Sequence, residues 1–528
     1  MKSRFLPLIA LSCTALPSCG GKGDVKEAVL QRPNILLIVA DDQSYPHAGA
    51  YGCPWVKTPG FDRIAAEGIL FENCYTPNAK SAPSRATLLT GRYSWQLEDL
   101  GNHIPVWPDG KYKTFFEALS ENGYHVGFTG KGWAPGNPGR NVDGDVRELT
   151  GTPYQSREVE NPPTQCLGKW DYEKNFEDFL SDADGRPWLF WMGIREPHRP
   201  YEYGTGVSLG GKKEEDIDSV PSYWPDDSTV RNDMLDYAFE IEYYDAQIVR
   251  TLDYLRDKGM LDNTLVIITA DNGMPFPRRK GNSFECSTHL PLAVMWPSGV
   301  RNPGRTSSEY ISMVDFAPTI LSLAGVDPER SGMAPVSGKS FTDILSDRSE
   351  GGRDVLLFGR ERHDAARPEN QGYPIRGILE DGFLYLHNLK PWLYPAGNPE
   401  IGYRDADSSP TKTDILHRRR FQGDSLYWKI NFGLRDEEEL YDLSTDPECM
   451  RNLSLDPASK KRMKALRRRM EKALKKGGDP RMGDNGDIFD TYPYYQQNKF
   501  DNYYERWFSG KINKKKEKTF NLDDYEKE

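Results

Sequence analysis

The sequence predicts an α/β fold in which a largely parallel sheet is sandwiched between helices and a smaller α+β domain follows. Three apolar runs, 34–40, 188–194 and 264–270, are typical of strands buried on both faces. Helical patterns lie between these runs: a capped helix that begins at Thr58-Pro59 and an amphipathic segment from about 232 to 259. Such alternation favours a parallel sheet with helices on both sides.

The C-terminal part of the sequence has a different pattern of predicted elements and more polar segments. The chain has 528 residues, which is enough for one large core and a smaller domain. After about residue 385, a short strand pattern at 439–443 and a basic helix pattern at about 458–475 stand among polar segments. We therefore predict a main domain at 32–384 and an α+β subdomain with a polar tail at 385–528.

The N-terminus has the pattern of an export signal at 1–19, with two basic residues before an apolar stretch too short to span a membrane. Leu16-Pro17-Ser18-Cys19 resembles a bacterial lipoprotein cleavage box, which would make Cys19 a lipid anchor. Simple cleavage is the alternative, because Pro17 is unusual in such a box. Residues 20–31 are a polar tether. We expect an exported protein, in the periplasm or anchored to the outer membrane of a bacterium.

The net charge and the cysteine spacing limit the classes of partner and metal that we expect. The formal net charge of -11 argues against nucleic acid, but a pocket of a few basic side chains can still attract an anionic substrate. Seven cysteines occur, and none forms a Cys-x-x-Cys pair, which argues against a zinc site. The only membrane contact that we expect is the possible N-terminal anchor.

One stretch, Ser81-Ala82-Pro83-Ser84-Arg85-Ala86-Thr87-Leu88-Leu89-Thr90-Gly91, suggests chemistry on an anion. Pro83 suits the first turn of a helix, so Ser81 would lie at a helix N-terminus, where negative charge is favoured. Arg85, one turn later, could hold an oxyanion. The alternative is an ordinary Ser-Pro-Ser helix cap, which is the commoner meaning of such a string.

Polar side chains follow two of the buried runs. Asp41 and Asp42 come after 34–40, and Asp271 and Asn272 come after 264–270. Ligands of open α/β sheets bind at the carboxyl ends of strands, and adjacent buried carboxylates are costly unless they bind something positive. Hard oxygen ligands suit Ca²⁺ or Mg²⁺ rather than zinc. Loop caps are the alternative for each pair.

The stretch 81–91 resembles the sulfatase signature Cys/Ser-x-Pro-Ser-Arg-x4-Thr-Gly at every fixed position. The resemblance runs from Arg32 to about Met482 and implies an alkaline-phosphatase-like catalytic domain. In this family the first motif residue is oxidised to formylglycine (3-oxoalanine), whose hydrated aldehyde is the nucleophile. Because that residue is Ser81, the chain resembles the serine-type bacterial sulfatases, which need a dedicated maturase.

The resemblance also implies roles for other residues. It makes the four polar residues after the strands divalent cation ligands, usually for Ca²⁺, and it makes Lys131 and Lys280 sulfate-binding cations beside Arg85. Arg278 and Arg279 lie close enough to leave the Lys280 assignment open. His198, in Glu-Pro-His-Arg-Pro, corresponds to the histidine that protonates the leaving group. Many relatives carry a histidine where this chain has Trp133, which puts one proton-handling role in doubt.

Several stretches resemble the heparan N-sulfatase (sulfamidase) branch of the family, namely 270–277, 360–363, 373–376, 387–389 and 478–480. We expect Arg362 and His363, with Trp133, to contact the sugar; packing motifs are the alternative. The predicted function is removal of sulfate from the glucosamine nitrogen of heparin or heparan fragments. The alternatives are an O-sulfatase acting on another host or algal glycan, a phosphoester hydrolase, and a glycan-binding lipoprotein without turnover.

Overall fold

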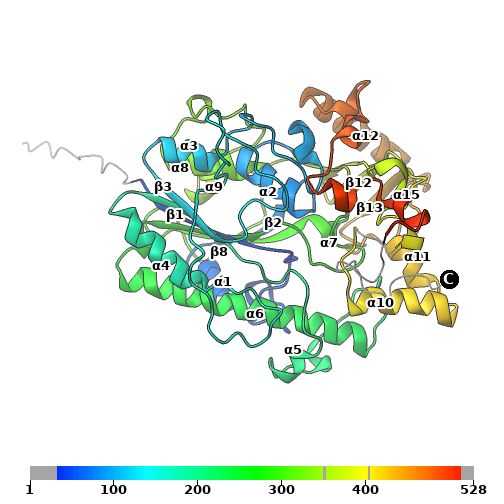
Figure 1. The fold of residues 1–528 in the computed structure, drawn as a ribbon, viewed down its shortest axis with the longest axis horizontal. Helices are drawn as coiled ribbons and strands as arrows, with labels where there is room; N and C mark the ends of the chain where they lie inside the picture. The colour runs from blue at the N-terminus through cyan, green and yellow to red at the C-terminus, as the bar shows by residue number, and fades with distance from the viewer. Residues whose placement is uncertain (1–31, 349–351, 402–404, 513–528) are drawn as a thin grey trace, which may run out of the picture. The chain divides into compact units, whose positions relative to one another are not determined.

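A mixed, mostly parallel sheet forms the centre of the larger part of the molecule (Figure 1). The computed structural model describes residues 32–348, 352–401 and 405–512, so the predicted signal at 1–19 and tether at 20–31 lie outside the described residues. The strand order is β4-β3-β5-β1-β6-β7-β2-β8, with β9 also paired to β2. The strands are β1 Asn34–Ala40, β2 Ile69–Tyr75, β3 His125–Gly130, β4 Thr152–Pro153, β5 Trp188–Gly193, β6 Thr264–Ala270, β7 His289–Met295, β8 Arg305–Ser307 and β9 Ile311–Ser312.

Because neighbouring strands of this first sheet run parallel, their carboxyl ends lie at the same edge. Strands β3, β5, β1 and β6 are parallel neighbours, so their carboxyl ends lie together. Strand β7 is antiparallel to both β6 and β2. Strand β2 therefore runs with β6 and ends at the same edge, whereas β7 begins there. Loops from five strands consequently meet at this carboxyl edge.

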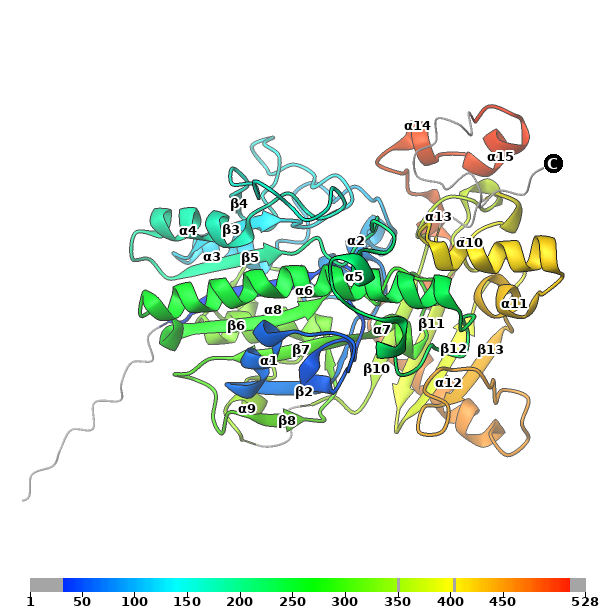
Figure 2. The same ribbon diagram turned by 90° about the horizontal axis from the view of Figure 1, so that it is seen from below.

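Helices cover both faces of the first sheet (Figure 1). Helices α2 Ser81–Thr90, α3 Phe115–Glu121, α8 Phe316–Leu323 and α9 Thr342–Leu345 lie on one face. Helices α1 Pro59–Ala66, α4 Tyr172–Ala183 and α6 Ser228–Asp257 lie on the other, and α6 extends to α10 Pro410–His417 (Figure 2). The shorter helices are α5 Thr205–Ser208 and α7 Glu285–Thr288. Among the described residues, no helix is both long enough and apolar enough to cross a membrane.

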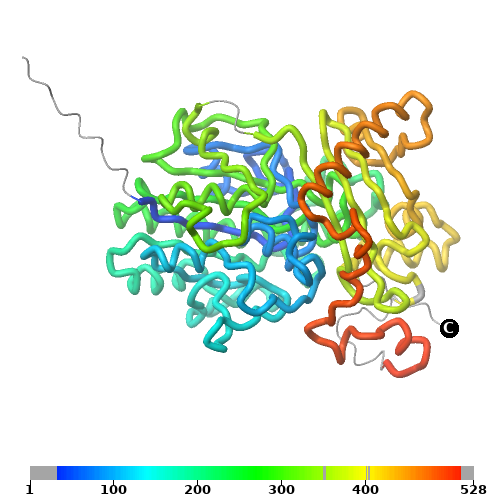
Figure 3. Tube along the Cα trace, turned by 90° about the horizontal axis from the view of Figure 1, so that it is seen from above, coloured from blue at the N-terminus to red at the C-terminus, as the bar shows by residue number. Residues whose placement is uncertain are grey.

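A second, antiparallel sheet follows in the order β10-β11-β12-β13. Its strands are β10 Leu356–Arg360, β11 Ile375–Glu380, β12 Phe383–Asn388 and β13 Glu438–Asp442. Helix α12 Lys460–Lys476 lies over this sheet (Figure 3) and buries Leu466, Met470 and Leu474 against it. The remaining helices are α11 Leu426–Phe432, α13 Ile488–Thr491, α14 Gln497–Phe500 and α15 Tyr503–Phe508. The predicted domain boundary after residue 384 falls inside β12.

The predicted fold class is confirmed: a mostly parallel sheet between helices, accompanied by a small antiparallel sheet. The predicted runs 34–40 and 264–270 are β1 and β6, and every residue of β6 is buried. The second sheet packs against the segment that leads to Ser81. There the Gly359 amide donates to the Pro77 carbonyl at 2.8 Å, and a side chain at Gly359 would collide with Trp95. This contact joins the two sheets close to the carboxyl edge.

Candidate active site

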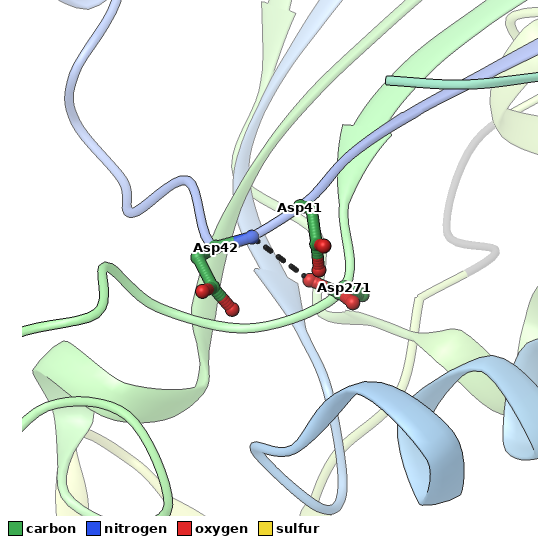
Figure 4. Close-up of side chains that lie close together, drawn as sticks. All are labelled: Asp41, Asp42 and Asp271. Carbon is green, nitrogen blue, oxygen red and sulfur yellow. Dashed lines mark hydrogen bonds between the residues drawn. The ribbon is translucent and has the colours of Figure 1, made fainter. Parts of the chain in front are cut away.

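Three carboxylates meet at the carboxyl edge of the first sheet (Figure 4). Asp41 and Asp42 follow β1 and Asp271 follows β6; one oxygen from each lies within 4.8 Å of the others. All three side chains are buried. The register explains the meeting, because Ala40 and Ala270 are direct partners at the ends of parallel strands. Three negative charges are thereby held together out of water, which is costly unless they are neutralised.

Local backbone geometry directs the second carboxylate toward the others. Asp42 adopts a φ of 73°, a left-handed conformation that Asp tolerates better than most residues. Its amide donates to Asp271 Oδ1 at 3.0 Å (Figure 4). The chain therefore turns sharply after β1 and keeps both aspartates at the same point.

Asn272 completes a set of oxygen donors. Its Nδ2 donates to Asp42 Oδ1 at 2.7 Å and to the Gly273 carbonyl at 2.9 Å, which fixes the amide orientation. Its Oδ1 is buried and has no hydrogen-bond partner in the described part of the chain. An orphaned carbonyl oxygen beside three carboxylates fits a hard divalent cation such as Ca²⁺ or Mg²⁺, and the set contains neither sulfur nor imidazole.

Ser81 is the first residue of α2 and lies beside the carboxylates. Its hydroxyl donates to Asp41 Oδ1 at 3.2 Å and accepts from Lys131 Nζ at 3.0 Å. Lys131 follows β3 and also donates to both oxygens of Asp41, at 2.7 and 2.6 Å. Residue 81 therefore stands at a helix N-terminus with a cation within reach, where developing negative charge is stabilised.

Arg85 holds this arrangement in place through buried hydrogen bonds. Its side chain is fully buried, and all three guanidinium nitrogens have partners. Nε donates to Asp271 Oδ2 at 2.9 Å, Nη2 to Asp41 Oδ1 at 3.4 Å, and Nη1 to the carbonyls of Lys131 and Gly132. Instead of the predicted contact with an oxyanion, the geometry gives Arg85 the task of orienting the two aspartates and the Lys131 turn.

Lys280 approaches the site from the loop between β6 and β7. Its Nζ lies 2.6 Å from Asp42 Oδ2 and 2.8 Å from Asp407 Oδ2. Burial by itself lowers the pKa of Lys280, but the Asp407 and Asp42 carboxylates outweigh burial and raise it well above its usual range. Lys280 is therefore a permanent positive charge. The neighbouring Arg278 and Arg279 instead bind the Cys449 carbonyl and the Tyr223 hydroxyl, which leaves Lys280 as the basic side chain of this loop at the site.

His198 lies in the loop after β5, with its Nε2 3.9 Å from Asp42 Oδ2. Its Nδ1 contacts the Arg199 carbonyl at 2.5 Å, and since a carbonyl only accepts, Nδ1 carries the hydrogen and Nε2 faces the site. Removal from water and the positive charge of Lys280 lower the pKa of His198 to about 4. About a third of its side chain is exposed, so a substrate can reach it.

A cavity of about 840 Å³ opens beside these groups and is lined in part by Asp41, Lys131 and His198. Trp133 forms one wall: its Nε1 donates to the Ala82 carbonyl at 3.1 Å, and its ring packs edge-on against Trp107. Trp133 can therefore meet a substrate through its ring face but cannot exchange a proton. Arg195, also exposed at the cavity wall, is a lining residue that the sequence did not single out.

Arg362 and His363 are not brought into this group. Arg362 donates to the carbonyls of Asp490 and Tyr492 and lies over the Tyr494 ring. His363 is fully buried, and its Nε2 donates a hydrogen bond to Asn78 Oδ1 at 2.8 Å. Burial also lowers the pKa of His363 well below the usual range. Neither side chain has a surface open to a saccharide, so their predicted contact with the sugar has no geometric support.

Asp407 is the side chain at the site that sequence reasoning missed. It follows no predicted strand and belongs to no motif; it is the fifth residue after Gly402 in a polar stretch. Its proximity to Lys280 arises only from tertiary packing. No strand end, motif or spacing in the sequence signals it.

This fold and edge geometry are accompanied by a match to a family model described as Sulfatase, over residues 33–326. The chain belongs to the sulfatase family. A second model, described as N-sulphoglucosamine sulphohydrolase, C-terminal, matches residues 278–377 of this sulfatase, a range that includes Lys280, β10 and the start of β11.

Individual relatives agree with this assignment. The chain is 28% identical to human N-sulphoglucosamine sulphohydrolase, a match that covers 89% of this chain and 95% of the relative. It is 26% identical to an ulvan-active sulfatase of Formosa agariphila, over 85% of this chain and 76% of the relative. A solved structure, described as a complex with its substrate D-glucosamine-2-N,6-O-disulfate, has the same fold: the TM-score is 0.59 at 20% identity, over 86% of this chain and 99% of that one.

Proposed function

We propose that this protein is an exported sulfatase that hydrolyses the N-sulfo group of glucosamine in heparin or heparan sulfate fragments. The observation that carries the proposal is the combination of the Ser81-centred edge site with the match of residues 278–377 to the model described as N-sulphoglucosamine sulphohydrolase, C-terminal. The human relative of that name and the solved complex with a doubly sulfated glucosamine support the same substrate class.

Two groups would be added to the chain for this chemistry. Formylglycine made from Ser81 by a serine-type maturase supplies a nucleophilic oxygen, and Ca²⁺ held by Asp41, Asp42, Asp271 and Asn272 supplies Lewis acidity. The donor set fits Mg²⁺ chemically as well, and the family resemblance favours Ca²⁺.

The chain's own residues bind and orient the sulfo group. Lys131 and Lys280 lie on two sides of residue 81 and the carboxylates, where both can contact sulfuryl oxygens. Arg85 keeps Asp41, Asp271 and the Lys131 turn in register. Charge that grows on the sulfuryl oxygens is therefore met by groups already in position.

His198 acts on the leaving side. When the S–N bond breaks, the electron pair stays on nitrogen, and a proton from His198 Nε2 converts it to a neutral amine. The bound sulfo group brings negative charge next to His198, which favours the protonated imidazole that the free site disfavours.

The pattern of an export signal in residues 1–19 supports a proposal for the location. We propose that the protein works in the periplasm or, if Cys19 is lipidated, on the outer membrane of a bacterium. The partners are then the sulfated saccharide and the maturase.

A second candidate is an O-sulfatase that acts on another host or algal glycan, which the similarity to an ulvan-active sulfatase favours. A glycan-binding protein without turnover would not require the full set of nucleophile, cation ligands and basic side chains. A phosphoester hydrolase would not require an intact formylglycine motif.

The test is co-expression with a serine-type maturase, followed by intact-mass analysis and sulfate release. N-sulfoglucosamine and glucosamine 6-O-sulfate are incubated separately, with Ser81→Ala as the control. We expect conversion of Ser81 to the aldehyde and release from the N-sulfated sugar. Release from the 6-O-sulfated sugar alone would favour the second candidate, and full maturation without release from the N-sulfated sugar would contradict the proposed function.

A further inference from the structure

Asp407 has no part in the chemistry described above, yet it contacts Lys280, one of the basic residues of the site. Its Oδ2 is 2.8 Å from Lys280 Nζ, the same atom that lies 2.6 Å from Asp42 Oδ2. The Asp407 side chain keeps 27% of its surface exposed, whereas Asp42 is fully enclosed. Asp407 is therefore a carboxylate beside the sulfate-binding lysine that a bound molecule can still reach.

The position of Asp407 is fixed by its neighbours in the chain. The Asp405 carboxylate accepts from Arg360 at 2.7 Å and from the Asp364 amide at 2.7 Å, and the Asp405 carbonyl accepts from Lys80 Nζ at 3.2 Å. Gly281, with a φ of 78°, lies against this segment, since a Cβ there would be 3.4 Å from the Asp405 carbonyl oxygen. The segment 405–407 is thus held directly over the Lys280 turn.

A negative charge at this point is not explained by anion binding. A sulfo group is drawn in by Lys131 and Lys280, and a nearby carboxylate opposes that attraction. Asp42 already contacts Lys280, so Asp407 is not needed to hold it. Burial raises the pKa of Asp407, but Lys280, Lys80 and His198 outweigh burial and lower it, so the carboxylate stays ionised. Such a group suits a donor or a cation.

The leaving group of a sulfamate provides both a hydrogen-bond donor before cleavage and a cation after it. A sulfamate nitrogen carries an N–H in the substrate; once the S–N bond breaks and His198 supplies a proton, the product is a primary amine, which takes a second proton from water and becomes an ammonium at neutral pH. An O-sulfate instead leaves as a neutral hydroxyl. Only a nitrogen leaving group therefore becomes positively charged next to His198.

We propose that Asp407 accepts the sulfamate N–H and then binds the ammonium product, and so selects nitrogen over oxygen leaving groups. This inference rests on the proposed N-sulfatase function. Asp407 lies close enough to His198 for their charges to interact, and its side chain keeps exposed surface that the other carboxylates, enclosed for a cation, lack.

The first experiment measures kcat/KM of the matured enzyme on N-sulfoglucosamine and on glucosamine 6-O-sulfate. We expect Asp407→Asn to lower kcat/KM for the N-sulfated sugar about 10- to 100-fold, the value of a charge-assisted hydrogen bond, and to change any 6-O activity less than about threefold. Asp364→Asn, which removes a carboxylate from Lys80 rather than Lys280, is the matched control and should leave the ratio of the two substrates unchanged.

The second experiment does not depend on turnover. Binding of glucosamine and of glucose is measured by calorimetry in the presence of sulfate, and binding of sulfate is measured alone. Asp407→Asn should weaken glucosamine about tenfold or more and leave glucose and sulfate as they were. Weaker sulfate binding together with equal losses on both substrates would overturn the proposal, because Asp407 would then only position Lys280. If the wild type hydrolyses O-sulfates alone, the proposed function fails, and glucosamine binding still decides the role of Asp407.

Discussion

Two buried groups of charges in this molecule contain the same kinds of side chain but differ in the protonation states that their surroundings favour. The edge cluster consists of Asp41, Asp42 and Asp271 with the basic residues that contact them. The second-sheet network joins Arg376 to Asp479 at 2.5 Å and to Glu361 at 2.6 Å, and joins Arg481 to Glu361 at 2.7 Å. The network is balanced and closed: each of these charges has an opposite partner, and Arg376 also lies over the Trp95 ring.

The edge cluster also pairs its three carboxylates with Arg85, Lys131 and Lys280, yet several groups there have pKa values that favour the neutral form. Burial raises the pKa of Asp42 to about 6 and also raises that of Asp271, whereas burial and Lys280 lower the pKa of His198 to about 4. In the second-sheet network, burial alone would lower the pKa of Arg376, but Asp479 and Glu361 outweigh it and raise the pKa well above the usual range. A closed network stabilises the fold by itself, whereas the edge cluster has room for a cation and an anion.

The largest expected effect is on catalysis. Ser81→Ala leaves both charge groups intact and removes the only proposed nucleophile, so sulfate release should fall by a factor on the order of 10³ or more. Sulfate release after maturase co-expression measures it, with unchanged thermal unfolding as the control. Residual release within tenfold of the wild type would remove residue 81 from the mechanism.

A matched pair of substitutions breaks each charge group in turn. Arg85→Met and Arg376→Met each remove a cation from two buried carboxylates and leave one of them, Asp271 or Asp479, without its ion-pair partner, which costs about 3–5 kcal/mol of unfolding free energy. Added Ca²⁺ should restore part of the loss for Arg85→Met, because the carboxylates there are cation ligands, and none for Arg376→Met. Thermal unfolding with and without Ca²⁺ measures both; equal rescue of the two variants would contradict the comparison.

Metal removal tests whether the edge cluster, unlike the second-sheet network, depends on a bound cation. Dialysis against a chelator should lower the melting temperature and abolish activity, since a cation at 100 times its Kd contributes about 2.7 kcal/mol. Returning Ca²⁺ should reverse both changes, and Asp271→Asn should respond less because it lacks one ligand. A protein shown by elemental analysis to be metal-free, with unchanged stability and activity, would exclude a cation at this site.

The smallest effect concerns a buried carboxyl outside both groups. Burial, with Glu196 nearby, raises the pKa of Glu240 to about 9, against about 4.3 for an unfolded chain. The folded state therefore holds this proton more tightly, and the stability that Glu240 contributes is complete below about pH 4 and is lost as the pH rises toward 9.

Glu240→Gln should remove this loss. We expect its melting temperature to exceed that of the wild type by about 1–3 °C at pH 8 and to equal it at pH 5. Differential scanning calorimetry across this range measures the difference. A constant offset at all pH values would mean that Glu240 does not titrate as proposed.

Much of the fold and of the edge cluster could be predicted because both depend on local patterns. An apolar run that ends in Asp41-Asp42 carries the information for β1 and for the position of its carboxylates, since parallel strands place their ends at one edge. Thr114 and Glu117 likewise form the capping box that their spacing indicates.

The rest could not be predicted because it depends on long-range packing. Arg85 was expected to face an oxyanion, but its spacing from Ser81 says nothing about the Asp271 carboxylate and Lys131 carbonyl that surround it. His363 stands in a motif of family resemblance, and only the structure shows that Asn78 and its burial remove it from solvent. Asp407 contacts Lys280 at a sequence separation of 127 residues, and no strand end in the sequence indicates that contact.

The strap formed by Asp405, Ala406 and Asp407 lies in the part of the gene downstream of β12, whereas residue 81 and the cation ligands are encoded upstream of it. If Asp407 has the role proposed above, the nucleophile and the choice of leaving group depend on segments that lie on opposite sides of β12 in the sequence. A chimera that keeps the first half of this chain and takes the strap from another sulfatase should keep its nucleophile and acquire a new preference.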